Sequence, residues 1–260
     1  TRSIEKMVGD EEKMASILGV GIALPGLIDY EAGSILSTHS LKEWEGFPIK
    51  TFLEDSLDTK VYMENDVKTI TLGEYHWGAG QQAKNVVYIW LGEGIGAGII
   101  INGDIYRGIT ASAGEVGYTE ISARGINRGK YPILYQDQRR FGEILTTQHL
   151  EFSMQQAASS NGRMTILKDA EINLQSIASA AKNNDELALD ALKEFGEILG
   201  ILTIGVINLF NPELIIMGGP VIDKCPMVLD SATRSAKADA LLIPAEVVKI
   251  KAGALKNRAG

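Results

Sequence analysis

A glycine-rich segment is the first feature of this sequence that could do chemistry. It follows the apolar run Asn85–Leu91 and reads Gly92-Glu93-Gly94-Ile95-Gly96-Ala97. The spacing matches a loose dinucleotide-binding fingerprint, but such a loop must open a helix whose N-terminus holds the pyrophosphate. Here a β-branched run, Ile99–Ile101, and an Asn-Gly hairpin signal follow instead. We therefore predict a strand–turn–strand unit, whose bare amides either cradle an anion or allow another backbone to approach closely.

Polar residues also stand where elements of the chain end. Asn65 and Asp66 follow the run Val61–Glu64 and precede a helical pattern, and Glu115 lies in a glycine-flanked segment. An Asn-Asp pair at a helix start is often only a cap, because its side-chain oxygens accept the first free amide protons. Glu115 alone could be a surface carboxylate. From these residues alone, both capping and ligand binding stay open.

The elements that would position these residues alternate between strands and helices. We predict strands at Leu18–Leu24, Val61–Glu64, Asn85–Leu91, Ile99–Ile101, Asp104–Tyr106, Leu214–Met217 and Val247–Ile250. We predict helices at Thr51–Leu57, Val67–Trp77, Phe152–Ala158, Ala170–Ala181 and Glu186–Leu209. The segment from Pro25 to Pro48 is interpreted as a loop region, and Gly125–Gln148 has no clear period. This order of elements indicates a mixed α/β fold.

Composition narrows the class of protein. The 260 residues carry a net charge of −8, with 45% hydrophobic and 22% charged residues, which is typical of a globular chain. A polyanion would on average be repelled. The single cysteine, Cys225, excludes an internal disulfide and fits a cytoplasmic protein, and no apolar run is long enough to span a bilayer. The chain opens in a charged, helix-like stretch, Ile4–Leu18, and both ends look truncated, so we expect a piece of a longer protein.

Five segments, taken in order, resemble the ROK family (repressor, open reading frame, kinase). They are LGVGIALPGLID at Leu18–Asp29, END at Glu64–Asp66, LGEGIGAGIIINGDIYRG at Leu91–Gly108, AGEVGY at Ala113–Tyr118 and NPELIIMGG at Asn211–Gly219. The resemblance implies a two-lobed α/β fold of the actin-like ATPase (ribonuclease H-like) type, with a sugar in the cleft between the lobes. We expect a truncated small lobe at 1–66 and a larger lobe at 67–260.

The same resemblance implies roles for particular residues. The predicted sugar contacts are Asn65, Asp66, Glu115, Tyr118 and Glu151. In kinase members the residue matching Asp66 is the general base on the accepting hydroxyl. The predicted phosphate and nucleotide side comprises Gly92, Glu93, Gly94, Gly96, Gly218 and Gly219. Glu151 could also belong to a solvated helix face, and the turn at Gly218 and Gly219 could be simple strand-to-helix geometry.

Three departures from the family pattern bear on function. Glu93 stands where kinase members usually have Thr. If its carboxylate lay about 4 Å from a phosphate oxygen, the repulsion between the two charges would be about 4 kcal/mol at an effective dielectric near 20. That corresponds to roughly a thousandfold weaker binding, although a bound Mg²⁺ could invert the sign. Tyr118 replaces a common His, and the cysteines of the family's zinc site are absent, so we predict no zinc and expect Tyr131 and Tyr135 to anchor that region by packing. The Asp-x-Gly-x-Thr phosphate loop and a winged-helix segment are not in this sequence.

We therefore predict the sugar-sensing effector domain of a ROK-type transcriptional regulator. Its monosaccharide would bind between the lobes, and DNA would be contacted only through a segment outside this chain. The alternative is an ATP-dependent sugar kinase that uses Mg and has Asp66 as base. A third possibility is an interaction module that binds neither ligand. By analogy with the family we expect a homodimer or homotetramer.

Overall fold

Two compact units make up the chain. The computed structural model describes residues 17–121, 126–127, 129–160 and 164–256, so the helix-like stretch expected at Ile4–Leu18 lies almost wholly outside it. Of these residues, 17–70 and Arg107–Ser112 form the first unit, and Thr71–Tyr106 with 113–256 forms the second. The chain therefore passes between the units three times, and Arg107–Ser112 is a short return into the first.

Strands and one helix build the first unit. β1 (Val20–Leu24) pairs in parallel with β4 (Val61–Asn65), and α3 (Ile49–Leu57) lies between them in sequence, as a parallel pair requires. β2 (Leu27–Asp29) and β3 (Ser34–Ser37) form an antiparallel pair, followed by the 3-10 helix η1 (Lys42–Trp44). The interpretation of Pro25–Pro48 as a loop region was therefore wrong, because strands this short carry too little alternation to be recognised.

A five-stranded mixed sheet forms the centre of the second unit, in the order β7-β6-β5-β8-β9. Its strands are β5 (Val86–Leu91), β6 (Ile95–Ile101), β7 (Asp104–Ile105), β8 (Leu214–Gly218) and β9 (Lys249–Ala252). β5 and β6 form the expected antiparallel hairpin, whereas β5, β8 and β9 run parallel. The last strand begins two residues later than predicted, because Val247 ends a helix.

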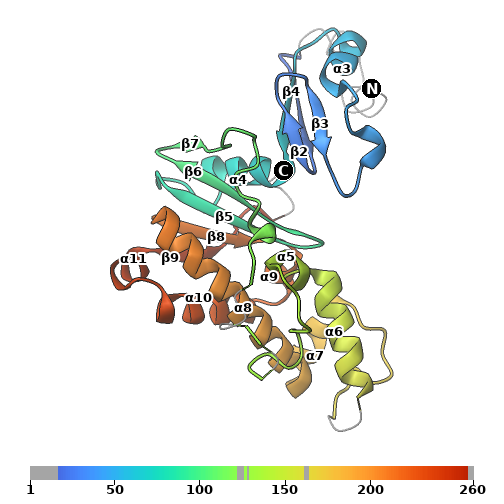
Figure 1. Cartoon of the computed structure of the whole chain (residues 1–260), viewed down its shortest axis with the longest axis vertical. Helices are drawn as coiled ribbons and strands as arrows, with labels where there is room; N and C mark the ends of the chain where they lie inside the picture. The colour runs from blue at the N-terminus through green and yellow to red at the C-terminus, as the bar shows by residue number, and fades with distance from the viewer. Residues whose placement is uncertain (1–16, 122–125, 128, 161–163, 257–260) are drawn as a thin grey trace. The chain divides into compact units, whose positions relative to one another are not determined.

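Helices of this unit lie on the sheet and beyond it (Figure 1). They are α4 (Asp66–Trp77), which begins in the first unit, α5 (Phe141–Ile144), α6 (Thr147–Ser159), α7 (Leu174–Lys182), α8 (Glu186–Phe210), α9 (Pro220–Lys224), α10 (Met227–Asp239) and α11 (Leu242–Val247), with the 3-10 helix η2 (Val116–Tyr118). α8 and α10 cover one sheet face, and the second half of α4 covers the other, where Thr71 closely approaches Gly98. The second unit is thus a three-layer α/β/α structure.

Periodic apolar residues explain why the long helix was recognisable. In the predicted core stripe of this helix, Leu192, Phe195, Leu199, Leu202 and Val206 are buried in the core that α8 shares with β5, β6 and β8. Leu189 is only half-buried, and the prediction was wrong for Leu209, which is 80% exposed near the end of α8. α10 was not predicted, since its sequence is rich in Ala, Ser and charged residues and has few large apolar positions. Among the described helices, none combines the length and apolar character needed to cross a membrane.

Candidate functional site

The corner between β4 and α4 holds the predicted pair Asn65 and Asp66. Asn65 ends β4, and its side chain, 8% exposed, is fully engaged as a donor. Its Nδ2 donates to Gly26 O at 3.1 Å and to Asp66 Oδ1 at 3.0 Å, while its Oδ1 accepts from Lys68 N at 3.0 Å. Asn65 therefore caps α4 and orients Asp66, and a ligand could use only its remaining acceptor capacity.

Asp66 has one carboxylate oxygen that is held by two neighbours. Its Oδ1 accepts from Asn65 Nδ2 at 3.0 Å and from Val67 N at 2.8 Å, and the backbone N–H of Asp66 itself is a further donor to the carboxylate. Burial raises the pKa of Asp66 above its ordinary value, although these hydrogen bonds and the Lys68 charge act in the opposite direction. A half-buried carboxylate with a raised pKa can accept a hydroxyl proton or bind a hydroxyl group.

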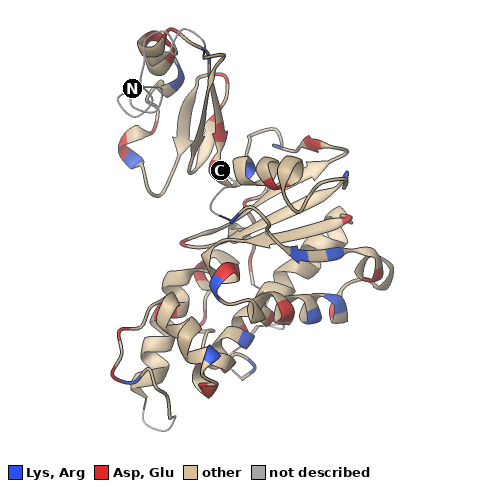
Figure 2. Ribbon diagram, turned by 180° about the vertical axis from the view of Figure 1, so that it is seen from behind, with Lys and Arg blue, Asp and Glu red and all other residues tan. Residues whose placement is uncertain are grey.

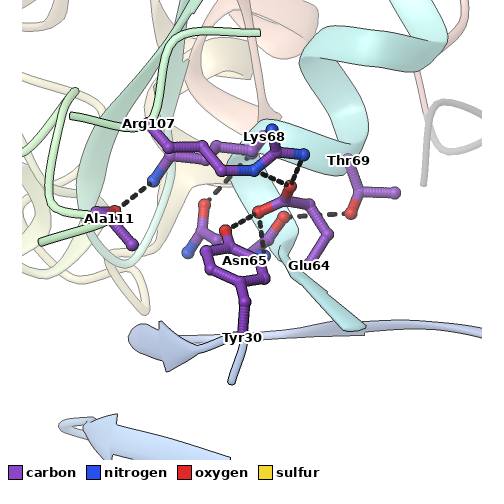
Figure 3. A network of polar contacts seen from close by, with 7 residues as sticks. All are labelled: Tyr30, Glu64, Asn65, Lys68, Thr69, Arg107 and Ala111. Atoms are coloured by element: carbon purple, nitrogen blue, oxygen red, sulfur yellow. Dashed lines mark hydrogen bonds and ion pairs between the residues drawn. The ribbon is translucent and has the colours of Figure 1, made fainter. Parts of the chain in front are cut away.

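Glu64, directly before this pair, is the centre of a polar network that the sequence analysis did not assign (Figure 3). Its Oε1 accepts from Tyr30 OH and, at 2.8 Å, from Asn65 N. Its Oε2 accepts from Arg107 Nε at 2.9 Å and Nη2 at 2.7 Å, and the guanidinium also stacks over the Tyr30 ring at 5.2 Å. Every member of this network belongs to the first unit.

The ionisation of the network follows from these contacts. Burial, together with the hydrogen bond to Glu64 and its charge, raises the pKa of Tyr30 to about 12. Burial alone would lower the pKa of Arg107, but the Glu64 contacts outweigh it and raise that pKa. Near neutral pH Tyr30 is therefore a neutral donor and Arg107 a cation, both directed at Glu64.

Two glycine turns come together in the second unit. β5 and β8 are parallel neighbours, so the turns that follow them lie at the same edge of the sheet. Gly92 N donates to Gly94 O at 3.0 Å, and Gly92 O accepts from Thr147 N at 2.8 Å, at the start of α6. Gly219 has φ +100°, and a Cβ there would lie 2.4 Å from Leu91 O, so only glycine fits between these turns.

Most of the residues predicted to lie on the nucleotide side are found at this edge of the sheet. Gly92, Gly94, Gly218 and Gly219 lie at or beside the two turns, and the Glu93 side chain is exposed at the tip of the first. Gly96 lies inside β6, paired with Trp90, because the strand already begins at Ile95. Gly219 is also the residue before α9, so it has the geometry of a strand-to-helix turn, and its nucleotide-side role stays a prediction.

Glu115 and Tyr118 lie at the short helix η2, which follows β7. Glu115 is half-buried at its N-cap, and Tyr118 is exposed with Arg140 stacked 5.2 Å from its ring centroid. The segment is fixed to β6 because Gly114 O accepts from Ala97 N at 2.8 Å; at φ +98°, Gly114 allows an approach that any Cβ would block. The prediction that Glu115 and Tyr118 contact a sugar therefore stays a prediction.

Glu151 has a structural partner in the second unit. It lies half-buried on α6, and its Oε1 accepts from Leu174 N at 2.7 Å, at the first turn of α7. This bond satisfies one of the free amides of the helix start and adds a favourable charge there. A sugar contact at Glu151 would share this carboxylate with the N–H of Leu174.

The segment around Tyr131 and Tyr135, where the resemblance to the ROK family implied a zinc site, is held by contacts with other protein groups. Tyr131 is fully buried and Tyr135 packs against the same core, as predicted. Glu194 from α8 accepts from Leu134 N at 2.9 Å and from Ile133 N, and His149 Nε2 bonds Leu134 O at 2.7 Å. The described residues contain no group of three His, Cys, Asp or Glu that could hold a metal ion, so this donor set does not fit zinc.

The fold is that of the actin-like ATPases, which the chain shares with ROK sugar kinases and a ROK transcriptional regulator of known structure. The chain itself belongs to the ROK family, whose sequence pattern it matches over residues 1–260. It is 31% identical over 220 residues to the xylose repressor of Bacillus spizizenii, covering 83% of this chain and 51% of the repressor.

Two further relatives point to both branches of the family. A glucokinase of Halalkalibacterium halodurans is 31% identical over 264 residues, covering 98% of this chain and 77% of the kinase. The crystal structure of a ROK family transcriptional regulator, a homologue of the Escherichia coli MLC protein, has a TM-score of 0.84 at 25% identity, covering 99% of this chain and 64% of that one. The chain spans about half the length of the xylose repressors that it matches.

Proposed function

We propose that this chain is the sugar-binding effector region of a cytoplasmic ROK transcriptional regulator. The observation that carries the proposal is the exposed carboxylate of Glu93 at the tip of the first glycine turn, beside the second turn at Gly219. A nucleotide phosphate on these amides would meet a like charge. The similarity to a xylose repressor supports the same branch of the family.

The sugar ligand would be recognised by hydroxyl contacts. In the first unit, Asp66 is the strongest candidate, since its carboxylate is already oriented by Asn65 and Val67. In the second unit, Glu115 and Tyr118 remain proposed sugar contacts, and Glu151 would contribute with a carboxylate that already binds a backbone N–H. Carboxylates suit this task because each can accept hydrogen bonds from more than one hydroxyl.

Regulation requires that sugar binding favours one state of the protein over another. A ligand shifts such an equilibrium only by its difference in affinity for the two states. DNA would be bound by a segment outside this chain, in line with the net charge of −8. In the described residues Lys and Arg are interspersed with Asp and Glu along the helices of the second unit (Figure 2).

The alternative is an ATP-dependent sugar kinase, which the state of Asp66 specifically favours. Its raised pKa suits a general base. In that reaction Asp66 would take the sugar hydroxyl proton as the oxygen bonds to the γ-phosphorus of Mg-bound ATP. The bond from that phosphorus to the bridging oxygen would break, and ADP would leave.

One experiment separates the two functions. Calorimetry with D-xylose, D-glucose and N-acetyl-D-glucosamine measures sugar binding, and coupled ADP release measures turnover with each sugar. The regulator proposal expects binding of at least one sugar without sugar-dependent ADP release. Turnover that Asp66→Asn abolishes would instead establish the kinase.

We also propose that the chain forms a homo-oligomer through an apolar surface of α8 and α11. This α8–α11 surface comprises the exposed Leu209, Phe210, Leu241, Leu242, Ile243 and Val247. Leu241 N donates to Asn208 Oδ1 at 3.0 Å, which joins the two elements. The six residues are 37% to 80% exposed and form one apolar patch, and the occupant we propose for it is a second copy of this chain.

A further inference from the structure

We propose that Glu64 and Arg107 are positioning residues for Asp66. Glu64 precedes the Asn65–Asp66 pair, and its side chain, 13% exposed, accepts four hydrogen bonds. Two of these come from the Arg107 guanidinium, which reaches Glu64 from the segment Arg107–Ser112. The part of this inference that concerns the ligand rests on the proposed sugar-binding function.

A continuous series of contacts leads from Arg107 to Asp66. Arg107 fixes Oε2 of Glu64, and Oε1 of the same carboxylate accepts from the backbone N–H of Asn65. Asn65 in turn donates from Nδ2 to Asp66 Oδ1 and accepts from Lys68 N. Tyr30 adds a second donor on Oε1 and lies beneath the guanidinium (Figure 3). Both oxygens of the Glu64 carboxylate are thus held, Oε2 by Arg107 and Oε1 by Tyr30 and Asn65. A planar group held at both of its oxygens rotates little, so the carboxylate has one preferred orientation.

The segment Arg107–Ser112 is held on the other side of the pair as well. Lys68, 2% exposed, donates from Nζ to Ala111 O at 3.0 Å. Glu64 and Lys68 thus flank Asn65 and Asp66 in sequence, and both bind the same short segment. The return of the chain into the first unit therefore has a local purpose: it fixes the corner that presents Asp66.

Stability alone does not account for this arrangement. The Arg107 side chain is 41% exposed, and ion pairs with that much exposure contribute little to folding. A carboxylate that binds the main chain of the adjacent site residue, and is itself oriented by two more side chains, instead controls geometry. We therefore expect a larger effect on the site than on the melting temperature when the pair is broken.

Two measurements test the proposal on Glu64→Gln and Arg107→Gln, with Lys193→Gln as a control that breaks the exposed 3.9 Å ion pair with Glu197. The first is amide hydrogen exchange of Asn65–Lys68 without ligand. In Glu64→Gln the side chain offers one acceptor oxygen in place of two, and in Arg107→Gln the Glu64 carboxylate loses the two donors that orient it. Exchange at Asn65–Lys68 should therefore accelerate ~10-fold, the equivalent of one lost hydrogen bond. The second is calorimetry with D-xylose and D-glucose, where affinity should fall ~10-fold, as when a group that orients a ligand-binding residue is removed.

The outcomes separate this inference from the proposed function. Unchanged exchange at Asn65–Lys68 in both variants overturns the positioning role, whatever the sugars do. Equal sugar affinity in the wild type, Glu64→Gln and Arg107→Gln overturns it as well. Accelerated exchange in a protein that binds no sugar supports the positioning role and defeats only the proposed function. If Glu64→Gln fails to fold, Arg107→Gln and Tyr30→Phe provide the same comparison, and Arg107→Lys should restore part of the protection.

Discussion

Asn65 and Asp66 are joined side chain to side chain: Nδ2 of Asn65 donates to Oδ1 of Asp66 at 3.0 Å. Because Asn65 also accepts from Lys68 N and donates to Gly26 O, it caps α4, links two loops and orients a carboxylate. Asn65 therefore has the capping role that its residue type predicts, and it also fixes Oδ1 of Asp66. The proposed ligand contact would use the Asp66 carboxylate in this orientation.

Asp66→Asn should leave the fold intact while weakening ligand binding. Burial raises the folded-state pKa of Asp66, so its stabilising contribution is complete below the unfolded pKa of about 3.8 and is lost as pH rises through the folded pKa. The variant should therefore be at least as stable as the wild type at pH 7, yet bind sugar at least ~10-fold more weakly. Urea denaturation at several pH values between 3 and 7, with calorimetry at pH 7, checks both effects. A variant that is clearly less stable at neutral pH would contradict the assignment.

Asn65→Ala should destabilise the protein, because it removes three side-chain hydrogen bonds, one of which caps α4. We expect a loss of about 1–3 kcal/mol in the free energy of unfolding. Asn173→Ala is the matched control, since Asn173 caps α7 by accepting from Ser176 N at 3.0 Å. Both variants should lose stability by urea denaturation, but only Asn65→Ala should also weaken sugar binding. Equal sugar affinities in the two variants would show that the orientation of Asp66 does not depend on Asn65.

Glu93→Thr should increase the affinity for ATP. The Glu93 side chain is exposed, so solvent reduces its repulsion of a phosphate, and we expect a gain of ~10-fold, well below the unscreened value. Glu93→Gln removes the charge at nearly constant size and should reproduce most of the gain. Calorimetry with ATP, with and without Mg²⁺, provides the measurement. If both variants bind ATP no better than the wild type, Glu93 is not what distinguishes this turn from that of a kinase.

Glu194→Ala should loosen the segment around Tyr131 and Tyr135. The change leaves the N–H groups of Ile133 and Leu134 without their acceptor in a buried place, at a cost of about 2–4 kcal/mol. Glu194→Gln keeps one acceptor oxygen and should cost roughly half as much. The two unfolding free energies from urea titrations test this. A loss of similar size in both variants would mean that the negative charge of Glu194, and not its acceptor geometry, holds the segment.

Leu242→Asp should reduce self-association. A charge at the centre of the α8–α11 surface cannot be buried against a second copy without a large desolvation cost. Light scattering of the eluting protein should show the variant as monomer at concentrations where the wild type is an oligomer. Tyr62→Asp places a charge at an exposed aromatic of the first unit and should leave the oligomer intact. A monomeric wild type would refute the proposed interface directly.

The sequence allowed the second unit to be predicted better than the first. The apolar residues of β5, β8 and α8 form long patterns and are mostly buried in the structure. The bounds of these three elements could therefore be predicted to within a few residues. The strands β2 and β3 are too short for a period, and α10 buries small residues that carry little signal. Short and small-residue elements are recognised only by what they pack against.

The candidate site was predictable in part for a similar reason. Asn65, Asp66 and the glycine turns are marked by residue type next to an element boundary, and these cues are local. The partnership of Glu64 with Arg107 spans 43 residues and an unpatterned segment, so no spacing rule could reveal it. The same holds for Glu194, which lies 60 residues from the turn at Leu134 that it stabilises.

The most direct test of the whole account is a paired measurement on the same preparation of the unaltered chain. Calorimetry with D-xylose, D-glucose and N-acetyl-D-glucosamine is followed by ADP-release assays with the sugar that binds most tightly, in the presence of Mg-ATP. We expect measurable binding of one sugar, weaker binding of that sugar by Asp66→Asn, and no sugar-dependent ADP release. Sugar-dependent ADP release by the wild type, or absence of binding to every sugar, would contradict the account.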